Sequence, residues 1–197
     1  TSTQGVTRRA ADLTRSHVSD VMKHRFSQET LLLGLKRVRL GDAGGGHGNL
    51  RHRAQFVDAQ KRAAVEAVLS EGEQTALGLA GFLTEVEGDT TLSAVVFDDP
   101  VTSLDHVRQE KVAERLVQLA GTRQVIVFTH DIGFDVDLKR AAEIPDVTVA
   151  ERHVSRHQDG PGHVSSTGPW DGLNVRQRLN ELDNAIAEIR AITDPEE

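Results

Sequence analysis

The sequence predicts an α/β fold with a mainly parallel sheet flanked by helices, preceded by an N-terminal helix and a β-hairpin. From residue 58 onward, amphipathic stretches alternate with short apolar runs, which is typical of α/β domains. The apolar runs are apolar or β-branched throughout, as expected for parallel strands that are covered on both faces. A chain of 197 residues is also long enough to bury one sizeable core and to carry an appendage.

The front of the chain is predicted to be a helix followed by a hairpin. Residues 3–26 follow a loose helical spacing with few apolar positions, which is typical of the last turns of a coiled-coil arm. Residues 31–40 and 51–57 favour two strands, joined by the glycine-rich segment 41–49. A glycine cluster can also cradle a phosphate, but no Gly-Lys-Ser/Thr follows it, so the pattern favours a hairpin turn.

The rest of the chain alternates between helices and strands. We expect helices over residues 58–68, 73–86, 106–120 and 132–142, and strands over 93–97, 124–129 and 147–151. A final helix carries Val175, Leu179, Leu182, Ile186 and Ile189 at a 4-3-4-3 spacing, which is a heptad seam just over two heptads long. Such a seam either docks on its own domain or pairs with a partner helix.

The predicted organisation has five segments. They are the end of a coiled-coil arm (1–26), a hairpin (27–57), the main α/β lobe (58–157), a loop (158–170) and a C-terminal helix (171–197).

Composition limits the class of protein. The absence of cysteine excludes a disulfide scaffold, a thiolate zinc site and a cysteine nucleophile, and fits a reducing cytoplasm. No apolar run approaches the length of a membrane span, so we expect no membrane partner. Residues 1–62 hold 12 Lys and Arg against 5 Asp and Glu, a basic portion that either faces a polyanion or is simply solvated. The first residue, Thr1, suggests a piece of something longer.

The segment Leu69–Gln74 predicts a capped helix start. Ser70 and Glu73 form an S-x-x-E capping box, which leaves the first N–H groups of the helix facing outward. Gly72 would let the backbone approach a ligand closely, and a helix start bearing a hydroxyl and an amide suits a phosphate. The alternative is an ordinary capped helix.

Polar residues follow two of the predicted strands. Asp98 and Asp99 end the first, and His130 ends the next along the chain. Ligands of open α/β sheets bind at this edge, where one carboxylate can hold magnesium and another can orient or deprotonate a water molecule. Ser103-Leu104-Asp105 follows shortly after the first strand.

Together these motifs resemble the ABC ATPases, in the chromosome-maintenance and DNA-repair branch that includes SMC, RecF and RecN. Leu69–Gln74 resembles the signature motif, Ala94–Asp99 the Walker B strand, Ser103–Asp105 the D-loop, and His130 the switch histidine. The Asp-Asp-Pro and Ser-Leu-Asp sequences are most similar to ATPase portions of anticodon nucleases and phage-defence proteins. The resemblance covers residues 26–142 and implies the C-terminal lobe of an ABC ATPase head.

The resemblance implies ATP and Mg²⁺ as cofactors and assigns roles to individual residues. Asp98 would hold magnesium, Asp99 would be the general base, and His130 would sense the γ-phosphate. The signature residues Ser70, Gly72, Glu73 and Gln74 would face nucleotide bound to a second head, and Asp105 would communicate across that homodimer interface. In this family such heads act on DNA or on an attached effector nuclease.

Two departures from the family pattern matter. Most members have glutamate where Asp99 stands, although aspartate is usual in the more similar group. The sequence also contains no G-x-x-x-x-G-K-[ST] loop, so the chain would need an N-terminal Walker A lobe, from the same or a separate polypeptide. We infer that it is the C-terminal half of a head.

Three alternatives remain open at this point. The first is a magnesium-dependent nuclease or phosphohydrolase that uses Asp98, Asp99 and His130 directly. The second is a non-catalytic interaction module with the shape of a head. The third is a zinc site, for which His153, His157 and His163 are the candidate ligands.

Overall fold

The computed structural model describes residues 3–42, 52–57, 65–145, 147–157, 160–166 and 175–193. The chain divides into two compact units, residues 1–147 and residues 148–197. Among the described residues, every helix is too short or too polar to cross a lipid bilayer.

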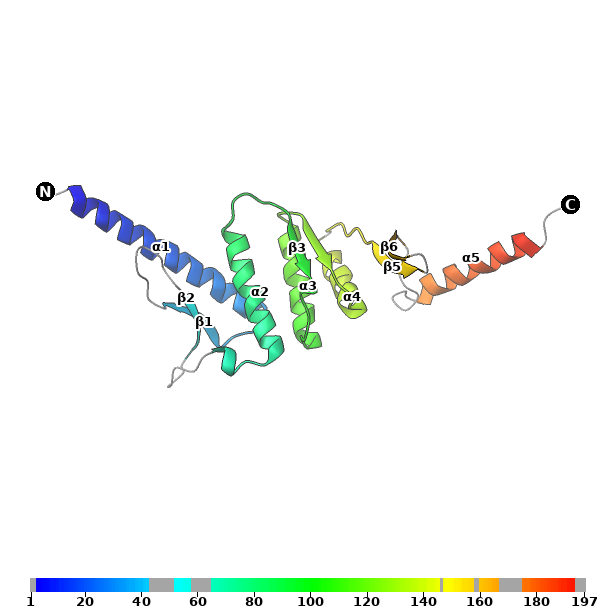
Figure 1. Ribbon diagram of the computed structural model, residues 1–197, viewed down its shortest axis with the longest axis horizontal. Coiled ribbons are helices and arrows are strands. Elements are labelled where there is room, and N and C mark those ends of the chain that lie inside the picture. The colour runs from blue at the N-terminus through cyan, green and yellow to red at the C-terminus, as the bar shows by residue number, and fades with distance from the viewer. Residues whose placement is uncertain are drawn as a thin grey trace. The chain divides into compact units, whose positions relative to one another are not determined.

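The first unit contains α1 (Thr3–Leu32), β1 (Val38–Asp42), β2 (His52–Phe56), the 3₁₀ turn η1 (Val65–Ala67), α2 (Glu71–Gly88), β3 (Val95–Asp98), α3 (His106–Ala120), β4 (Val125–Phe128) and α4 (Ile132–Glu143) (Figure 1). The second unit contains β5 (His153–His157), β6 (Gly160–Ser165) and α5 (Val175–Thr193). The α/β fold class is therefore as predicted.

Helix α1 is longer than its sequence pattern predicts. The helix predicted over 3–26 continues until Gly34, whose φ of +80° suits glycine, ends it. The Leu35 N–H donates to the Thr30 carbonyl at 2.6 Å, which closes the last turn. The strand predicted over 31–40 is therefore wrong in its first half, because that apolar run belongs to the end of the helix.

Strands β1 and β2 form the predicted antiparallel hairpin. Val38 lies opposite Phe56 and Asp42 opposite His52, and β1 packs against α1. The tip of the predicted loop, from residue 43 on, lies outside the described residues, as does most of the helix predicted over 58–68.

The centre of the first unit is built from β3, β4 and the helices around them. β3 and β4 pair in parallel, from Val95 opposite Val125 to Asp98 opposite Phe128. Phe97 meets Phe82 of α2 edge to face, with ring centroids 5.7 Å apart. Apolar side chains of the helices complete this core: Ala76, Ala80, Leu83, Val112, Leu116, Leu119 and Phe134.

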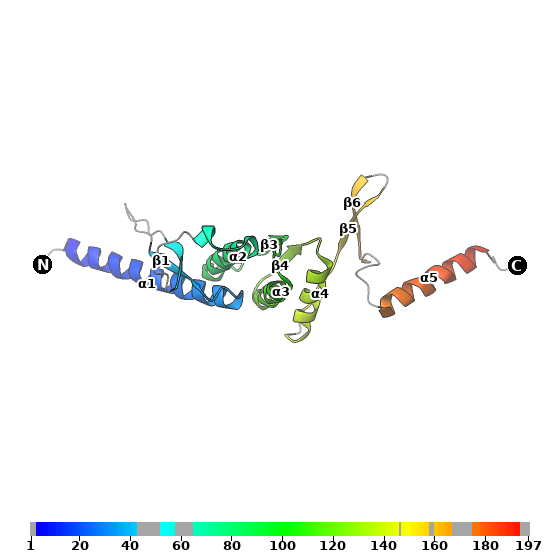
Figure 2. The same cartoon turned by 90° about the horizontal axis from the view of Figure 1, so that it is seen from below.

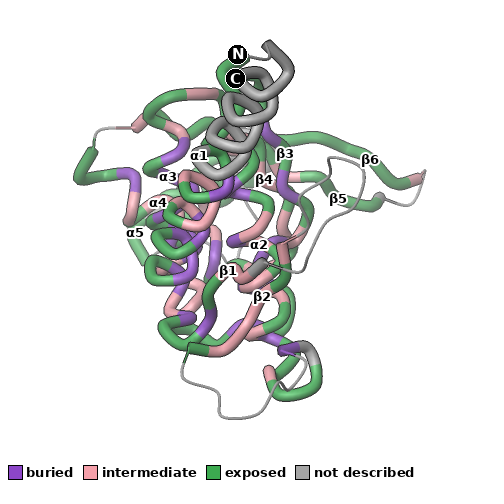
Figure 3. Tube along the Cα trace, turned by 90° about the vertical axis from the view of Figure 1, so that its left-hand side faces the viewer, coloured by how far each residue is buried: buried purple, intermediate pink, exposed green. Residues whose placement is uncertain are grey.

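One face of the β3–β4 pair is uncovered. Val95 and Phe97 are buried, whereas Val96, Ile126 and Phe128 on the other face are 54%, 36% and 56% exposed. Figures 2 and 3 show α3 and α4 on the same side of the two strands. The prediction of a sheet covered on both faces is therefore wrong for the described residues, although the apolar sequence that suggested it is present.

A buried ion cluster ties three helices together. Arg115 of α3 donates to both carboxylate oxygens of Glu29 in α1, at 2.7 and 2.9 Å, and to Glu87 of α2 at 2.7 Å. Arg115 and Glu29 are only 6% and 4% exposed. A bidentate pair in this setting is strong and directional, so it fixes the position of α1 on α3.

The second unit departs from the prediction. Residues 147–152 are irregular, so the strand predicted over 147–151 is wrong. Strand β5 begins at His153, two residues after the predicted strand was expected to end. β5 pairs antiparallel with β6, which lies in the segment predicted as the loop 158–170. This hairpin could not be predicted from the sequence, because its strands are rich in Gly, His and Ser and have few apolar residues. The final helix is present as α5.

Candidate functional site

The polar residues that follow β3 and β4 lie together, as the parallel arrangement of these strands requires. Asp99 comes directly after β3, and its N–H donates to the Phe128 carbonyl at 2.9 Å. Asp99 has a φ of +42°, an unusual conformation for a residue other than glycine. Backbone strain of this kind clusters at functional sites, which makes Asp99 a candidate.

The Asp99 carboxylate is held by His130. The His130 backbone N–H donates to Oδ1 at 3.2 Å, and the ring Nδ1 lies 2.7 Å from Oδ2. The hydrogen bond from the His130 ring is the main cause that lowers the pKa of Asp99 below its ordinary value. An ionised carboxylate only accepts hydrogen bonds, so in this contact Nδ1 of His130 is the donor.

Asp98 lies on the uncovered face of the sheet. It shares this face with Val96 of the same strand and with Phe128 opposite it. Within the described part of the chain, no hydrogen bond or ion pair holds its carboxylate. Magnesium commonly takes one or two protein carboxylates and completes its shell with phosphate and water, so the exposed Asp98 fits that ion.

A small cleft of about 170 Å³ lies beside Asp99 and His130. The loop of residues 101–104 forms one wall, and Gln109 and Asp131 form another. Gln109 Nε2 donates to Asp131 at 3.1 Å, which joins the start of α3 to the start of α4. The cleft can admit a water molecule or a small polar group next to the Asp99 carboxylate.

The predicted capping box at the start of α2 is confirmed. The Ser70 N–H donates to Glu73 Oε2 at 3.0 Å, and the Glu73 N–H donates to Ser70 Oγ at 3.3 Å. Gln74 Nε2 donates to the Leu69 carbonyl at 3.1 Å. Ser70 and Gln74 remain exposed, whereas Gly72 is buried.

Gly72 permits a close approach to the chain itself. A Cβ at this position would come within 2.4 Å of the Ser103 carbonyl oxygen and 3.5 Å of Leu104 Cα. The start of α2 therefore packs directly on the Ser103–Asp105 loop. The sequence had suggested that the glycine makes room for a ligand, and in this structure the space is taken by backbone.

Arg108 links the same two motifs through charge. It donates to Glu73 of the capping box at 3.1 Å and to Asp105, whose other oxygen caps α3 by accepting from the Arg108 N–H at 3.1 Å. The Ser70 N–H is the main cause that lowers the pKa of Glu73, and Arg108 adds to it. Partial burial opposes ionisation of Asp105, but hydrogen bonds from Arg108 outweigh it and lower the Asp105 pKa.

Sequence reasoning missed three residues of this site: Arg108, Gln109 and Asp131. The signal for Asp131 was available, because an Asp before an apolar helical run is a common N-cap, and it caps α4 by accepting from the Phe134 N–H at 3.1 Å. For Arg108 and Gln109 no such signal exists. Their contacts depend on the packing of the start of α3 against the starts of α2 and α4, which are distant in the sequence.

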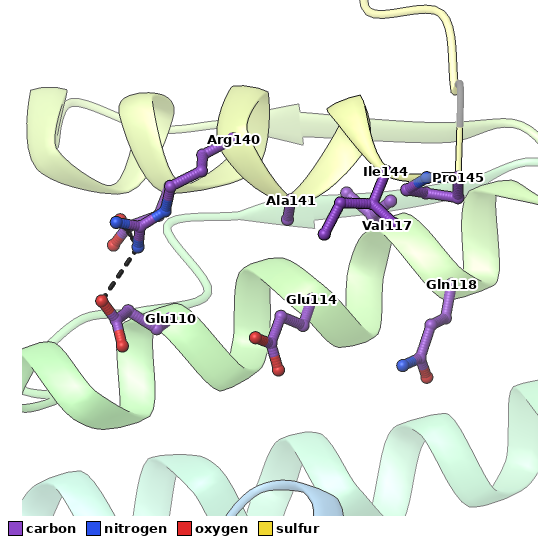
Figure 4. A pocket seen from close by; sticks show the side chains of 9 residues that line it. Glu110, Glu114, Val117, Gln118, Arg140, Ala141, Ile144 and Pro145 are labelled. Atoms are coloured by element: carbon purple, nitrogen blue, oxygen red, sulfur yellow. Dashed lines mark hydrogen bonds and ion pairs between the residues drawn. The ribbon is translucent and has the colours of Figure 1, made fainter.

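Within the part of the chain that the structure describes, no group of three or more His, Cys, Asp or Glu side chains gathers as a metal site. The side chain of His157, one of the candidate ligands of the zinc hypothesis, lies outside that part. A larger groove of about 590 Å³ lies between α3 and α4, and Arg140 bridges its sides by donating to Glu110 at 2.9 Å (Figure 4). None of the motif residues lines this groove.

The comparison with protein families decides the class. Residues 16–137, more than half of the chain, match the family described as "AAA domain, putative AbiEii toxin, Type IV TA system". The chain belongs to this family. No curated protein matches the sequence significantly.

Members of the SMC ATPase group have the same fold. One solved chain, from work on the ATP-driven dimerisation and DNA-stimulated activation of SMC ATPases, has a TM-score of 0.58 at 19% identity, and the match covers 87% of this chain and 95% of that one. An SMC head bound to the C-terminal winged-helix domain of ScpA gives 0.56 at 21% identity, covering 74% and 42%. An SMC head from Pyrococcus furiosus with an extended coiled coil gives 0.58 at 17%, covering 89% and 39%.

These likenesses establish the fold. This member of the AAA family has an SMC-like ATPase fold, the fold of a nucleotide-hydrolysing ATPase. It spans nearly all of the first solved chain and less than half of the two SMC head chains.

Proposed function

We propose that this chain is the C-terminal half of an ABC-type ATPase head that hydrolyses ATP at a site shared between two heads. The observation that carries the proposal is the contact between Asp99 and His130 at the carboxyl ends of two parallel strands, with Asp98 one residue away. In an open α/β sheet this edge is where ligands bind.

The chain's own residues would divide the work as follows. Asp99, ionised at neutral pH, would orient the attacking water and accept its proton, and His130 would keep the carboxylate in place and face the γ-phosphate. Asp98 would hold Mg²⁺. Bound Mg·ATP would supply the phosphoryl group that is transferred to water.

The uncovered sheet face supports the need for a second lobe. The sequence has no phosphate loop, so a lobe carrying one must come from elsewhere in the protein or from another chain. Val96, Ile126 and Phe128 offer an apolar surface next to Asp98. Because each is already about half covered, burying it fully would stabilise the association by roughly 1 kcal/mol. A lobe on this face would bring phosphates to Asp98.

The proposed site also needs a second head, which would hold the nucleotide that the signature residues of this chain face. Ser70 and Gln74 are exposed at the start of α2, where the helix dipole favours an anion. We propose that they meet the γ-phosphate of nucleotide held by the partner head, and that Asp105 communicates across the interface between the two heads. A solved SMC ATPase of the same fold is described by ATP-driven dimerisation, which is the behaviour expected here.

We propose that the head works in a phage-defence system, with DNA maintenance as the alternative setting. The description of the family, which names a putative toxin of a type IV toxin–antitoxin system, supports the first. Residues 1–26 would then be the end of a coiled-coil arm that returns to the head.

The test is to co-express the chain with its phosphate-loop lobe and measure ATP hydrolysis with and without Asp99→Asn. We expect the turnover rate to fall by a factor on the order of 10²–10⁴, the usual contribution of a general base, while ATP-dependent dimerisation persists. Asp135→Asn, on α4 and paired with Lys139, is the matched control and should leave turnover unchanged.

Two results would overturn the proposal. Unchanged turnover in Asp99→Asn would remove the base assignment. An intact phosphate loop with neither hydrolysis nor ATP-dependent association would make the chain a non-catalytic module.

A further inference from the structure

The apolar stripe of α5 is exposed among the described residues of the second unit. Val175, Leu179, Leu182, Ile186 and Ile189 are 75%, 55%, 47%, 45% and 63% exposed. They occur at a 4-3-4-3 spacing, which places them on one side of the helix. A continuous apolar stripe of this length on a helix marks a surface that another helix covers.

The residues beside the stripe identify the kind of helix that fits. With Leu179 and Ile186 at heptad position a, and Leu182 and Ile189 at position d, Arg178 occupies a g position and Asp183 the following e position. In a parallel pair of identical helices, each g residue faces the e residue five positions later on the partner. Arg178 of each helix would then lie beside Asp183 of the other.

An antiparallel pair would bring like charges together. When Leu182 packs opposite Ile186 in that arrangement, position 183 faces position 183, an Asp beside an Asp, and position 176 faces position 190, an Arg beside an Arg. Like charges at these positions oppose pairing, and opposite charges favour it. When the two stripes overlap along their full length, the charge pattern of α5 therefore favours a parallel partner with the same sequence over an antiparallel one.

We propose that α5 is a homodimerisation helix that pairs in parallel with α5 of a second copy of this chain. The contact does not need ATP, the phosphate-loop lobe or the signature residues, so it is separate from the association between heads proposed above. It would keep two copies together when no nucleotide is bound. Head engagement would then occur within an existing dimer, at a high effective concentration.

The first experiment measures the mass of the full chain by sedimentation equilibrium over a range of concentrations without nucleotide. We expect a monomer–dimer equilibrium that Leu182→Asp weakens by a factor on the order of ten or more, because the variant places a charge in the seam. Asn184→Asp puts the same residue on the opposite side of α5 and is the matched control. Ser70→Arg should leave this equilibrium unchanged.

The second experiment tests the direction of pairing. Because the chain has no cysteine, Leu182→Cys supplies one thiol per copy, and two such thiols meet only in the parallel arrangement. We expect rapid formation of a disulfide-linked dimer under mild oxidation, and little with Asn184→Cys. Arg178→Asp should weaken the dimer about two- to fivefold, and adding Asp183→Arg should restore it, as expected for paired surface charges.

Three outcomes would overturn the proposal. The first is a chain that stays monomeric while Leu182→Asp lowers its melting temperature, since α5 would then pack within its own chain. The second is a dimer that tolerates Leu182→Asp. The third is a dimer that Leu182→Cys cannot cross-link, which would mean antiparallel pairing.

Discussion

Helices α3 and α5 are both amphipathic, but the apolar side of α3 is buried and that of α5 is exposed. Both carry an apolar stripe with polar residues on the other side. In α3 the stripe is buried, with Val112 and Leu116 each 1% exposed, whereas in α5 no member of the stripe is less than 45% exposed. The spacing of apolar residues therefore identifies the side of a helix that is suited to burial. Whether that side is buried depends on which other segments pack against it.

A buried ion cluster anchors α3 to its neighbouring helices. Glu29→Ala would leave Arg115 buried with only the more exposed Glu87 as a partner. We expect the free energy of unfolding to fall by about 3–5 kcal/mol, as for other buried pairs that lose one member. Urea denaturation followed by circular dichroism measures this change. Glu85→Ala, at an exposed position of α2, serves as the control, and a loss below about 1 kcal/mol in Glu29→Ala would contradict the role given to the cluster.

One substitution in each helix tests whether burial of the apolar side differs between α3 and α5. Leu116→Ala removes a fully buried side chain from α3, and we expect it to cost about 2–5 kcal/mol. Leu182→Ala in α5, measured at concentrations where the chain is monomeric, should cost less than about 1 kcal/mol, because an exposed side chain loses little burial. Equal losses in the two variants would mean that α5 is packed within its own chain.

The smallest expected effect concerns the start of α3. Arg108→Ala removes the link between Glu73 and Asp105 and should cost about 1 kcal/mol at neutral pH, because all three side chains are partly exposed. Arg108 contributes to lowering the pKa of both carboxylates, so its stabilisation is present above their ordinary pKa and is lost as the pH falls through the lowered values.

The difference between wild type and Arg108→Ala should therefore shrink below about pH 4, in the range where carboxylates protonate. Arg108→Lys, which keeps the charge but cannot bridge in the same way, should lie between the two. Thermal unfolding at a series of pH values tests this, and a difference that does not depend on pH would contradict it.

The local parts of the site could be predicted from sequence because their signals are local. The capping box of Ser70 and Glu73 lies within four residues, and α3 has the predicted bounds because Asp105 precedes an amphipathic run. The nearness of Asp99 and His130 followed from one further step, namely that two buried strands in succession are parallel and end at the same edge.

What could not be predicted depends on contacts between segments far apart in the sequence. Nothing near Gly72 reveals that Ser103 will occupy the space beside it, and nothing near Arg108 reveals Glu73, 35 positions away. The end of α1, predicted at residue 26 and observed at Leu32, could not be predicted for a different reason. The apolar run before Gly34 suits a strand and a buried last helical turn equally well, and only the glycine distinguishes them.

The uncovered face of β3 and β4 has a consequence for how the protein must be made. Apolar side chains that face water can pack against any neighbouring molecule, so a chain whose second lobe is missing would be prone to aggregate. The amount of folded protein would then depend on the supply of whatever covers Val96 and Phe128, whether that cover lies in the same polypeptide or in another.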